Sequence, residues 1–266
     1  MDPSKQKVTV KTLQAMKRKG QVISMLTAYD FPTAQLLDEA NIDCILVGDS
    51  LGMVVQGKST TVPVTIEEMI YHGEIVVRAV KRAMVIIDLP FPVGQLGIKH
   101  TVKVAADILK KTQCHAVKME GGHLQAESIR ALVDAGIPTI AHIGLRPQSV
   151  HTMGGYRMQR DFDQLQKDAL AAEKAGAFAV LIECVPAEMA KTVTETVQIP
   201  TIGIGAGSEC DGQVLVTNDM LGWNSGYVPK FVKQFVDLRS QAKIAIESYK
   251  RQLQDRTFPG ASETLS

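Results

Sequence analysis

The sequence lacks any uninterrupted apolar run approaching the roughly 18 residues of a membrane-spanning helix. Its first residues carry no apolar segment like that of a secretory signal, so we expect a cytoplasmic protein. The sequence also lacks an excess of one charge. It has 29 Lys and Arg and 28 Asp and Glu, which gives a net charge of +1. No basic block indicates nucleic acid, so we expect no nucleic-acid partner.

Cysteine is scarce, and the four that occur are far apart, with no CxxC pair and no short disulfide framework. Three of them lie in or beside predicted strands. This pattern favours buried, reduced thiols over metal ligands. The four are Cys44, Cys114, Cys184 and Cys210.

What the sequence does contain is a repeated short apolar run that ends in a polar residue. The stretch 42–50 closes on Gly48, Asp49 and Ser50 after five apolar residues broken only by Asp43. Runs of this length are typical of strands buried on both faces of a parallel sheet. The other four runs are 84–88, ending at Asp88; 116–120, ending at Glu120; 139–142, ending at His142; and 178–183, ending at Glu183.

Three further strands and the helices between them complete the α/β pattern. Alternating strands and helices indicate parallel pairing, and eight strands close a (β/α)8 TIM barrel. We therefore expect one domain over 1–266, with a short N-terminal helix and a loose C-terminal tail. A doubly wound open sheet is the alternative, because periodicity does not prove closure. The added strands are 22–27, 201–205 and 213–216; the helices are 9–19, 31–40, 65–82, 101–111, 124–134, 162–175, 186–197 and 230–252; the long loops are 51–61 and 144–160; the tail is 258–266.

The polar strand ends predict a metal site. A closed barrel brings the carboxyl ends of its strands to one face, so Asp49, Asp88 and Glu120 should gather there. Three carboxylates in a water-poor site repel one another unless a cation joins them. Oxygen ligands without Cys or paired His favour Mg²⁺. A single Asp at a strand end is more often a cap or a loop acceptor, but the recurrence favours a site.

Lys118 and His142 have less certain roles. Lys118 lies two residues before Glu120 and faces the same side of its strand. It fits a Schiff-base lysine, an anchor for an anionic substrate, or a salt bridge to Asp88 or Glu120. His142 taken alone is more often structural than catalytic. The glycine-rich segment 203–207 is not a dinucleotide fingerprint, which leaves a backbone anion site or tight packing.

Seven segments, taken together, resemble the ketopantoate hydroxymethyltransferase family over roughly residues 8–240. VGDSLGM and VKMEGG are the most specific of them. The segments are MLTAYD at 25–30, VGDSLGM at 47–53, DLPF at 88–91, VKMEGG at 117–122, HIGL at 142–145, Glu183, and IGIGAG at 202–207 with CDGQVLV at 210–216.

The resemblance implies a (β/α)8 barrel assembled as a homo-oligomer, usually a decamer. It implies transfer of a hydroxymethyl group from 5,10-methylenetetrahydrofolate to 3-methyl-2-oxobutanoate, giving 2-dehydropantoate on the route to pantothenate and coenzyme A. It also implies one Mg²⁺ per subunit and an enolate stabilised by that ion. By motif, Asp49, Asp88 and Glu120 surround the Mg²⁺; Asp49, Ser50, Asp88 and Lys118 contact the oxo acid; and Glu183 is the proton acceptor.

Two other functions remain open at this point. Another Mg²⁺-dependent carbon–carbon lyase or mutase, of the phosphoenolpyruvate mutase and isocitrate lyase kind, typically uses a nucleophilic cysteine in a loop near the metal. No cysteine stands in the loops after the second and fifth predicted strands. A barrel kept as a ligand binder or scaffold is expected to have lost a metal carboxylate or Glu183, and neither is missing.

Overall fold

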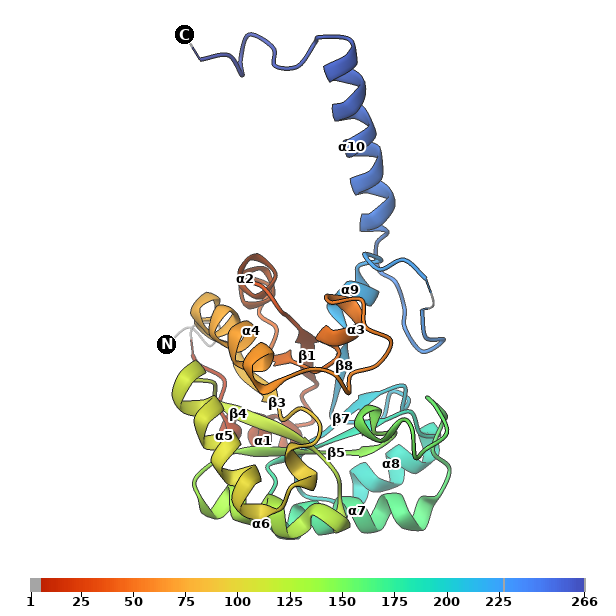
Figure 1. The fold of residues 1–266 in the computed structure, drawn as a ribbon. Coiled ribbons are helices and arrows are strands. Elements are labelled where there is room, and N and C mark those ends of the chain that lie inside the picture. Colours follow the sequence, from red (N-terminus) through yellow and green to blue (C-terminus); the bar gives the residue numbers. More distant parts are fainter. Residues whose placement is uncertain (1–5, 227, 266) are drawn as a thin grey trace. The chain divides into compact units, whose positions relative to one another are not determined.

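Eight parallel strands form a closed barrel in the computed structural model, which describes residues 6–226 and 228–265 (Figure 1). β1 pairs with both β2 and β8, so the ring is complete. The predicted TIM barrel is confirmed, and the open doubly wound sheet is excluded. The strands are β1 (Ile23–Thr27), β2 (Cys44–Val47), β3 (Met84–Asp88), β4 (Ala116–Glu120), β5 (Thr139–Gly144), β6 (Ala179–Glu183), β7 (Thr201–Ile204) and β8 (Gly212–Leu215).

Helices surround the strands on the outside of the ring (Figure 1). The predicted helix 65–82 begins with a capping box: the side chain of Thr65 accepts from Glu68 N while the Glu68 carboxylate accepts from Thr65 N. The helices of residues 1–216 are α1 (Val10–Arg18), α2 (Phe31–Glu39), α3 (Leu51–Val54), α4 (Ile66–Ala79), α5 (Ile98–Thr112), α6 (Ala126–Asp134), α7 (Phe162–Ala175) and α8 (Ala187–Thr196).

The barrel interior is filled by side chains from alternate strand positions, as the period of two along a strand requires. Leu13 of α1 belongs to this core cluster and is 1% exposed. Lys17 Nζ adds an ion pair to Asp211 Oδ2 at 2.8 Å, next to the start of β8. α1 is therefore packed against the N-terminal end of the barrel. The strand residues of the cluster are Ile23, Met25, Cys44, Leu46, Met84, Ile86, Ala116, Ile140, Ala179, Leu181, Ile202 and Val214.

One barrel connection has no helix, and none of the predicted helices falls there. Residues 205–211 join β7 to β8 without a helix. Gly207 has φ +80°, and a Cβ there would lie 2.5 Å from the Cβ of Ala187 at the start of α8. Only glycine tolerates both conditions, which favours tight packing as the reason for the glycines of 203–207.

Two elements differ from the sequence predictions. The predicted loop 51–61 begins with the short helix α3, and the predicted helix 230–252 is α10 (Leu238–Gln254). α10 starts later because Asp237 caps it, accepting from Ser240 N at 3.0 Å. In the predicted tail, the ring of Phe258 packs edge-on against Tyr249, with centroids 5.6 Å apart. Residue 266 lies outside the described residues.

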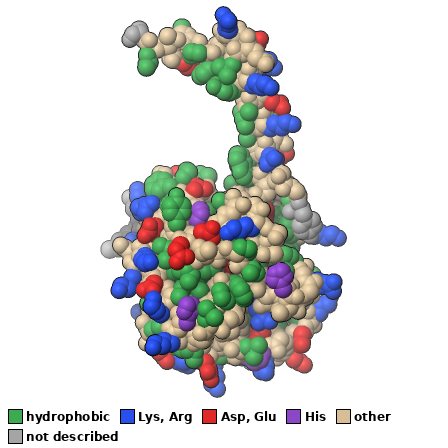
Figure 2. All heavy atoms as spheres, in the orientation of Figure 1, with side chains coloured by type: hydrophobic (Ala, Val, Ile, Leu, Met, Phe, Trp, Pro, Cys, Tyr) green, Lys and Arg blue, Asp and Glu red, His purple; other side chains and the backbone are tan. Residues whose placement is uncertain are grey.

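Contacts divide the chain into two compact units, residues 1–216 and residues 217–266. The first contains the whole barrel, and the second contains α9 (Thr217–Met220) and α10. On the visible face of the barrel unit, acidic and basic side chains are interspersed (Figure 2). Within the described residues, none of the helices combines the length and apolar character that a membrane crossing needs.

Candidate active site

The predicted site residues meet at the carboxyl ends of the strands. Asp88 closes β3 and is paired in register with Lys118 of β4, and Glu120 of β4 is paired with His142 of β5. Glu183 closes β6. The first four side chains are buried, and that of Glu183 is 17% exposed. Strand register therefore gathers groups that are nearly one hundred residues apart in sequence.

Lys118 forms the salt bridge that was one of its predicted roles. Its Nζ lies 2.7 Å from Asp88 Oδ1, with both side chains buried. Burial alone would lower the pKa of Lys118, but the charges of Asp88, Asp49 and Glu120 outweigh burial and raise the pKa. Lys118 is thus a permanent positive charge among carboxylates.

Asp49 and Glu120 are carboxyl groups that resist ionisation. Burial first, and then the charge of Asp88, raise the pKa of Asp49 to about 7. Burial and the charge of Asp49 raise the pKa of Glu120 well above its ordinary range. The backbone N–H of Asp49 donates to Asp88 Oδ2 at 3.3 Å, which ties the end of β2 to β3. These carboxylates need positive partners to remain charged.

Gln148 is a site residue that sequence analysis missed. It lies just after β5, in a short 3-10 turn at Pro147–Ser149, and is 6% exposed. Its side-chain Nε2 donates to Asp49 Oδ2 at 2.8 Å and to the carbonyl of Leu89 at 2.9 Å. Its backbone N–H lies 3.2 and 3.1 Å from the two carboxylate oxygens of Glu120.

His142 lies between Lys118 and Glu183. Its Nδ1 is 3.2 Å from Lys118 Nζ, and its Nε2 is 3.0 Å from Glu183 Oε2, although the second pair is not aligned as a hydrogen bond. Burial and the charge of Lys118 hold the pKa of His142 well below its usual range, so the ring is neutral. Since an ammonium can only donate, Nδ1 must accept, and the ring proton is on Nε2, facing Glu183.

Glu183 is a carboxyl group whose pKa lies near neutral pH. Burial raises the pKa of Glu183 to about 7, and Lys118 partly opposes that rise. A base whose pKa lies near the working pH is both available and strong. Its position at a strand end, facing the other polar groups, is the one that sequence analysis predicted.

Ser50 and two aromatic residues complete the surroundings. Ser50 Oγ shares a 2.7 Å hydrogen bond with the hydroxyl of Tyr29, which follows β1. Tyr156, in the loop after β5, donates its hydroxyl to Met53 Sδ at 3.6 Å. Burial and the charge of Asp49 raise the pKa of Tyr156, which shows that its phenol is close to the acidic cluster. Sequence analysis gave no signal for Tyr29 or Tyr156 beyond their membership of family motifs or long loops.

The donor chemistry of the three carboxylates fits a hard divalent cation. All three offer buried oxygen atoms of the kind that such cations prefer, and ionising Asp49 and Glu120 without a positive partner is costly. Within the part of the chain that the structure describes, no three His, Cys, Asp or Glu side chains converge closely enough to hold a metal ion together. Instead, Lys118 pairs with Asp88, and Gln148 donates to Asp49 and Glu120. That Asp49, Asp88 and Glu120 bind Mg²⁺ stays a prediction.

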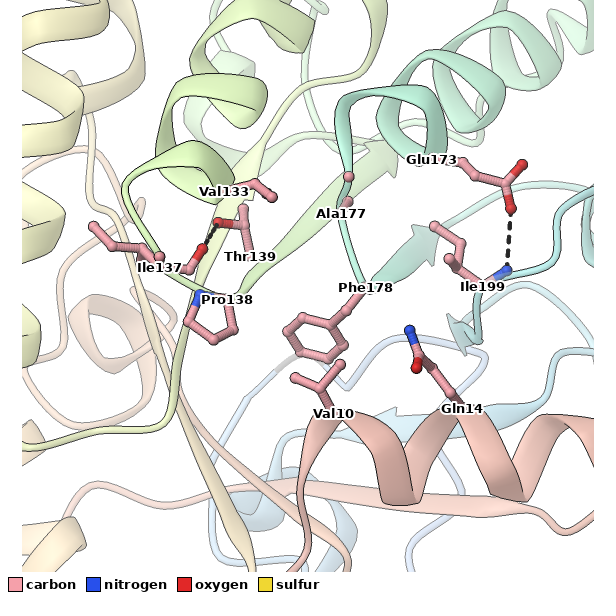
Figure 3. Close-up of a pocket in the computed structure, with 12 residues that line it drawn as sticks. Val10, Gln14, Val133, Ile137, Pro138, Thr139, Glu173, Ala177, Phe178 and Ile199 are labelled. Atoms are coloured by element: carbon pink, nitrogen blue, oxygen red, sulfur yellow. Dashed lines mark hydrogen bonds between the residues drawn. The ribbon is translucent and has the colours of Figure 1, made fainter.

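A cavity of about 460 Å³ lies at the opposite end of the barrel, beside α1 (Figure 3). Its lining is mainly apolar and includes Phe178 and Val10. The lining carboxylate of Glu173 already accepts N–H groups from Gln198 and Ile199, at 2.6 and 3.2 Å. This cavity contains none of the predicted site residues.

Several solved structures share the fold at low sequence identity. A phosphoenolpyruvate phosphomutase from Streptomyces platensis subsp. rosaceus superposes with a TM-score of 0.64 at 16% identity, covering 93% of this chain and 88% of that one. A phosphonopyruvate hydrolase in complex with oxalate and Mg²⁺ superposes with a TM-score of 0.63 at 13% identity, covering 97% and 91%. At this level of identity, these similarities show the fold alone.

Sequence relatives are far closer. A 3-methyl-2-oxobutanoate hydroxymethyltransferase of Rhodopirellula baltica is 58% identical over 98% of this chain and 97% of its own length. One of Desulforapulum autotrophicum is 53% identical over 95% and 96%. The family model described as ketopantoate hydroxymethyltransferase matches residues 7–261. The chain therefore belongs to the ketopantoate hydroxymethyltransferase family and is a hydroxymethyl-transferring enzyme.

Proposed function

We propose that this enzyme transfers a hydroxymethyl group from 5,10-methylenetetrahydrofolate to 3-methyl-2-oxobutanoate, giving 2-dehydropantoate for pantothenate and coenzyme A biosynthesis. The observation that carries the proposal is Glu183, a largely enclosed carboxyl group, 17% exposed, with a pKa of about 7. It lies beside the neutral ring of His142 and opposite the fixed charge of Lys118. The acceptor named for the sequence relatives carries an acidic C–H next to a keto group, which is what such a base removes.

The residues around Glu183 suit an oxo acid. Lys118 offers a buried positive charge to its carboxylate, and the Ser50 hydroxyl offers a hydrogen bond. Asp49 and Asp88 are the other proposed contacts of the oxo acid, and both are also proposed to bind the cation. Mg²⁺ bound by Asp49, Asp88 and Glu120 would supply positive charge where negative charge develops on the keto oxygen.

Glu183 then takes the C3 proton, and the electron pair of the C3–H bond moves into the oxo acid as an enolate. C3 forms a new bond to the methylene carbon of the folate, and both bonds from that carbon to the folate nitrogens break. One water supplies the hydroxyl oxygen, and the proton from C3 and the remaining proton of the water end on the two nitrogens, so the products are 2-dehydropantoate and tetrahydrofolate. Burial of the base and its neighbours keeps bulk water away from the enolate.

We also propose a cytoplasmic homo-oligomer, a decamer by resemblance to the family. Exposed apolar side chains on α10 support assembly, because apolar groups on one helix are typical of an interaction surface. They are Ile244, Ile246, Tyr249 and Leu253.

Exchange of the C3 hydrogen tests the assignment of the base. Glu183→Gln removes the proton acceptor but keeps the side-chain shape, so it should still bind 3-methyl-2-oxobutanoate while losing at least 100-fold in C3 exchange into deuterated water, followed by NMR. Glu188→Gln, an exposed change at the start of α8, is the matched control and should exchange normally. Undiminished exchange in Glu183→Gln would remove Glu183 from this role.

Turnover tests the donor and the metal. Formation of 2-dehydropantoate should require both Mg²⁺ and methylenetetrahydrofolate, and Asp49→Ala should abolish it. Equal turnover after exhaustive chelation would contradict the metal proposal without affecting the assignment of Glu183.

A further inference from the structure

Gln148 makes contacts with the acidic cluster that the proposed chemistry does not explain. It comes from the loop after β5, whereas Asp49 follows β2, Leu89 follows β3 and Glu120 ends β4. Its four donor contacts, at 2.8 to 3.2 Å, reach all three of those strand ends. A single buried residue therefore joins the ends of four barrel strands.

The orientation of the Gln148 amide is determined by its partners. Nε2 has two hydrogens, and both are directed at acceptors, Asp49 Oδ2 and the carbonyl of Leu89. A flipped amide would place its own oxygen against those two oxygens. The hydrogen bond to the Leu89 carbonyl fixes the direction from which the other N–H of the amide approaches Asp49.

The backbone N–H of Gln148 is held as firmly as its side chain. The turn that presents it is closed by hydrogen bonds from Ser149 N to Arg146 O at 2.9 Å and from Val150 N to Pro147 O at 3.2 Å. The N–H lies almost equally far from both oxygens of Glu120, which fixes the direction in which that carboxylate points.

These contacts leave the carboxylates able to bind a cation. A carboxylate has about four acceptor positions, and Gln148 Nε2 uses one on Asp49, at Oδ2. The amide carries no net charge, so it orients the acidic groups without neutralising them. A lysine in its place would supply the positive charge that a divalent ion would otherwise bring.

We infer that Gln148 is a positioning residue that orients Asp49 and Glu120 for a divalent cation. This inference rests on the proposed function, since it assumes that those carboxylates bind Mg²⁺. Outer groups that hold metal ligands in place typically change metal affinity 10- to 100-fold when they are removed.

Metal affinity measured without turnover tests this role. Mn²⁺ is titrated into the purified full-length chain and free Mn²⁺ is followed by electron paramagnetic resonance, with Mg²⁺ as competitor. Gln148→Met has similar length but no donor, and it should weaken Mn²⁺ binding at least tenfold. Gln159→Met is the matched control. Gln159 lies in the same loop, and its side-chain Nε2 donates to the carbonyl of Arg157 at 2.8 Å, so loss of that amide should leave affinity within twofold.

The outcomes distinguish a failure of this inference from a failure of the metal proposal on which it rests. A wild-type chain that binds no Mn²⁺ would overturn the metal proposal itself. A wild-type chain that binds, with Gln148→Met binding within twofold or more tightly, would overturn only the role of Gln148. Circular dichroism and the metal-free melting temperature establish that the variant is folded. If it is not, Gln148→Asn, whose amide is too short to reach both partners, should weaken binding at least threefold, and unchanged affinity there would count equally against the inference.

Discussion

At the scale of single residues, the site consists of groups whose environments change their acidity in different directions. Lys118 stays charged because carboxylates surround it, whereas His142 stays neutral because it is buried beside that same charge. The pKa of Glu183 is raised mainly by burial, since no neighbouring carboxylate contributes to the rise. A base that owes its strength to desolvation is most effective when the site stays closed to water.

The raised pKa of Glu183 predicts how the stability of the metal-free protein depends on pH. The pKa of Glu183 is about 7 in the folded chain against an ordinary value of 4.5, so the folded state binds this proton more tightly. The contribution of Glu183 to stability is then largest below pH 4.5 and is lost as the pH rises to about 7. The full shift corresponds to roughly 3 kcal/mol in the free energy of unfolding.

Urea unfolding at pH 5 and pH 8 measures this dependence. Between pH 5 and pH 8, the free energy of unfolding should fall by about 1–3 kcal/mol less in Glu183→Gln than in the wild type. The reason is that glutamine does not titrate. Asp49 and Glu120 change the slope in the same direction in both proteins. The charge of Glu183 also contributes to the raised pKa of Asp49, so its loss weakens the pH dependence of the variant in the same direction. Parallel pH dependences for the two proteins would show that Glu183 titrates normally.

At the scale of secondary-structure elements, α4 packs against the barrel through a glycine. A Cβ on Gly73 would lie 2.4 Å from Ile87 Cδ1 of β3 and 3.0 Å from Thr112 Cγ2 at the end of α5. Gly73 therefore sets how closely α4 approaches the barrel. Helix propensity favours Ala over Gly by about 1 kcal/mol, but overpacking of a buried contact costs about 1–3 kcal/mol.

Gly73→Ala should thus destabilise the protein by up to about 2 kcal/mol, measured by urea unfolding. The clash is chiefly with one methyl group, so Ile87→Val, which removes that methyl, should recover part of the loss in the double variant. Strictly additive effects of the two substitutions would show that the contact with Ile87 does not limit the position of α4.

The strands and the carboxylates at their ends could be predicted from sequence because each apolar run stops at its polar residue. All eight predicted strands occur within about two residues of their predicted bounds, and α7 begins and ends as predicted. Gln148 could not be found in this way, since an amide in a loop has no periodic signal and its partners belong to other strands. α3 was missed because four residues that include Gly52 do not establish a helical period.

At the scale of the whole molecule, the barrel unit contains every residue assigned to the chemistry, and residues 217–266 form a separate unit. None of the described residues of α10 is buried, although the helix carries large apolar side chains. A long helix gains most of its stability from packing an apolar face. Among the described residues of the second unit, the only ring packed against α10 is that of Phe258, which contacts Tyr249. A second copy of the chain is the partner that the proposed homo-oligomer supplies.

Removing residues 239–266 should therefore separate assembly from folding. We expect the shortened chain to keep the far-UV circular dichroism of a folded barrel and a cooperative thermal transition, while analytical ultracentrifugation shows a smaller particle. Ile244→Glu with Ile246→Glu should have the same effect on size without shortening the chain, and Gln241→Glu, an exposed polar position on the same helix, should not. The single domain over residues 1–266 stays a prediction. If the shortened chain lost its cooperative transition, that result would support it. An unchanged particle size in all three variants would mean that assembly does not use α10.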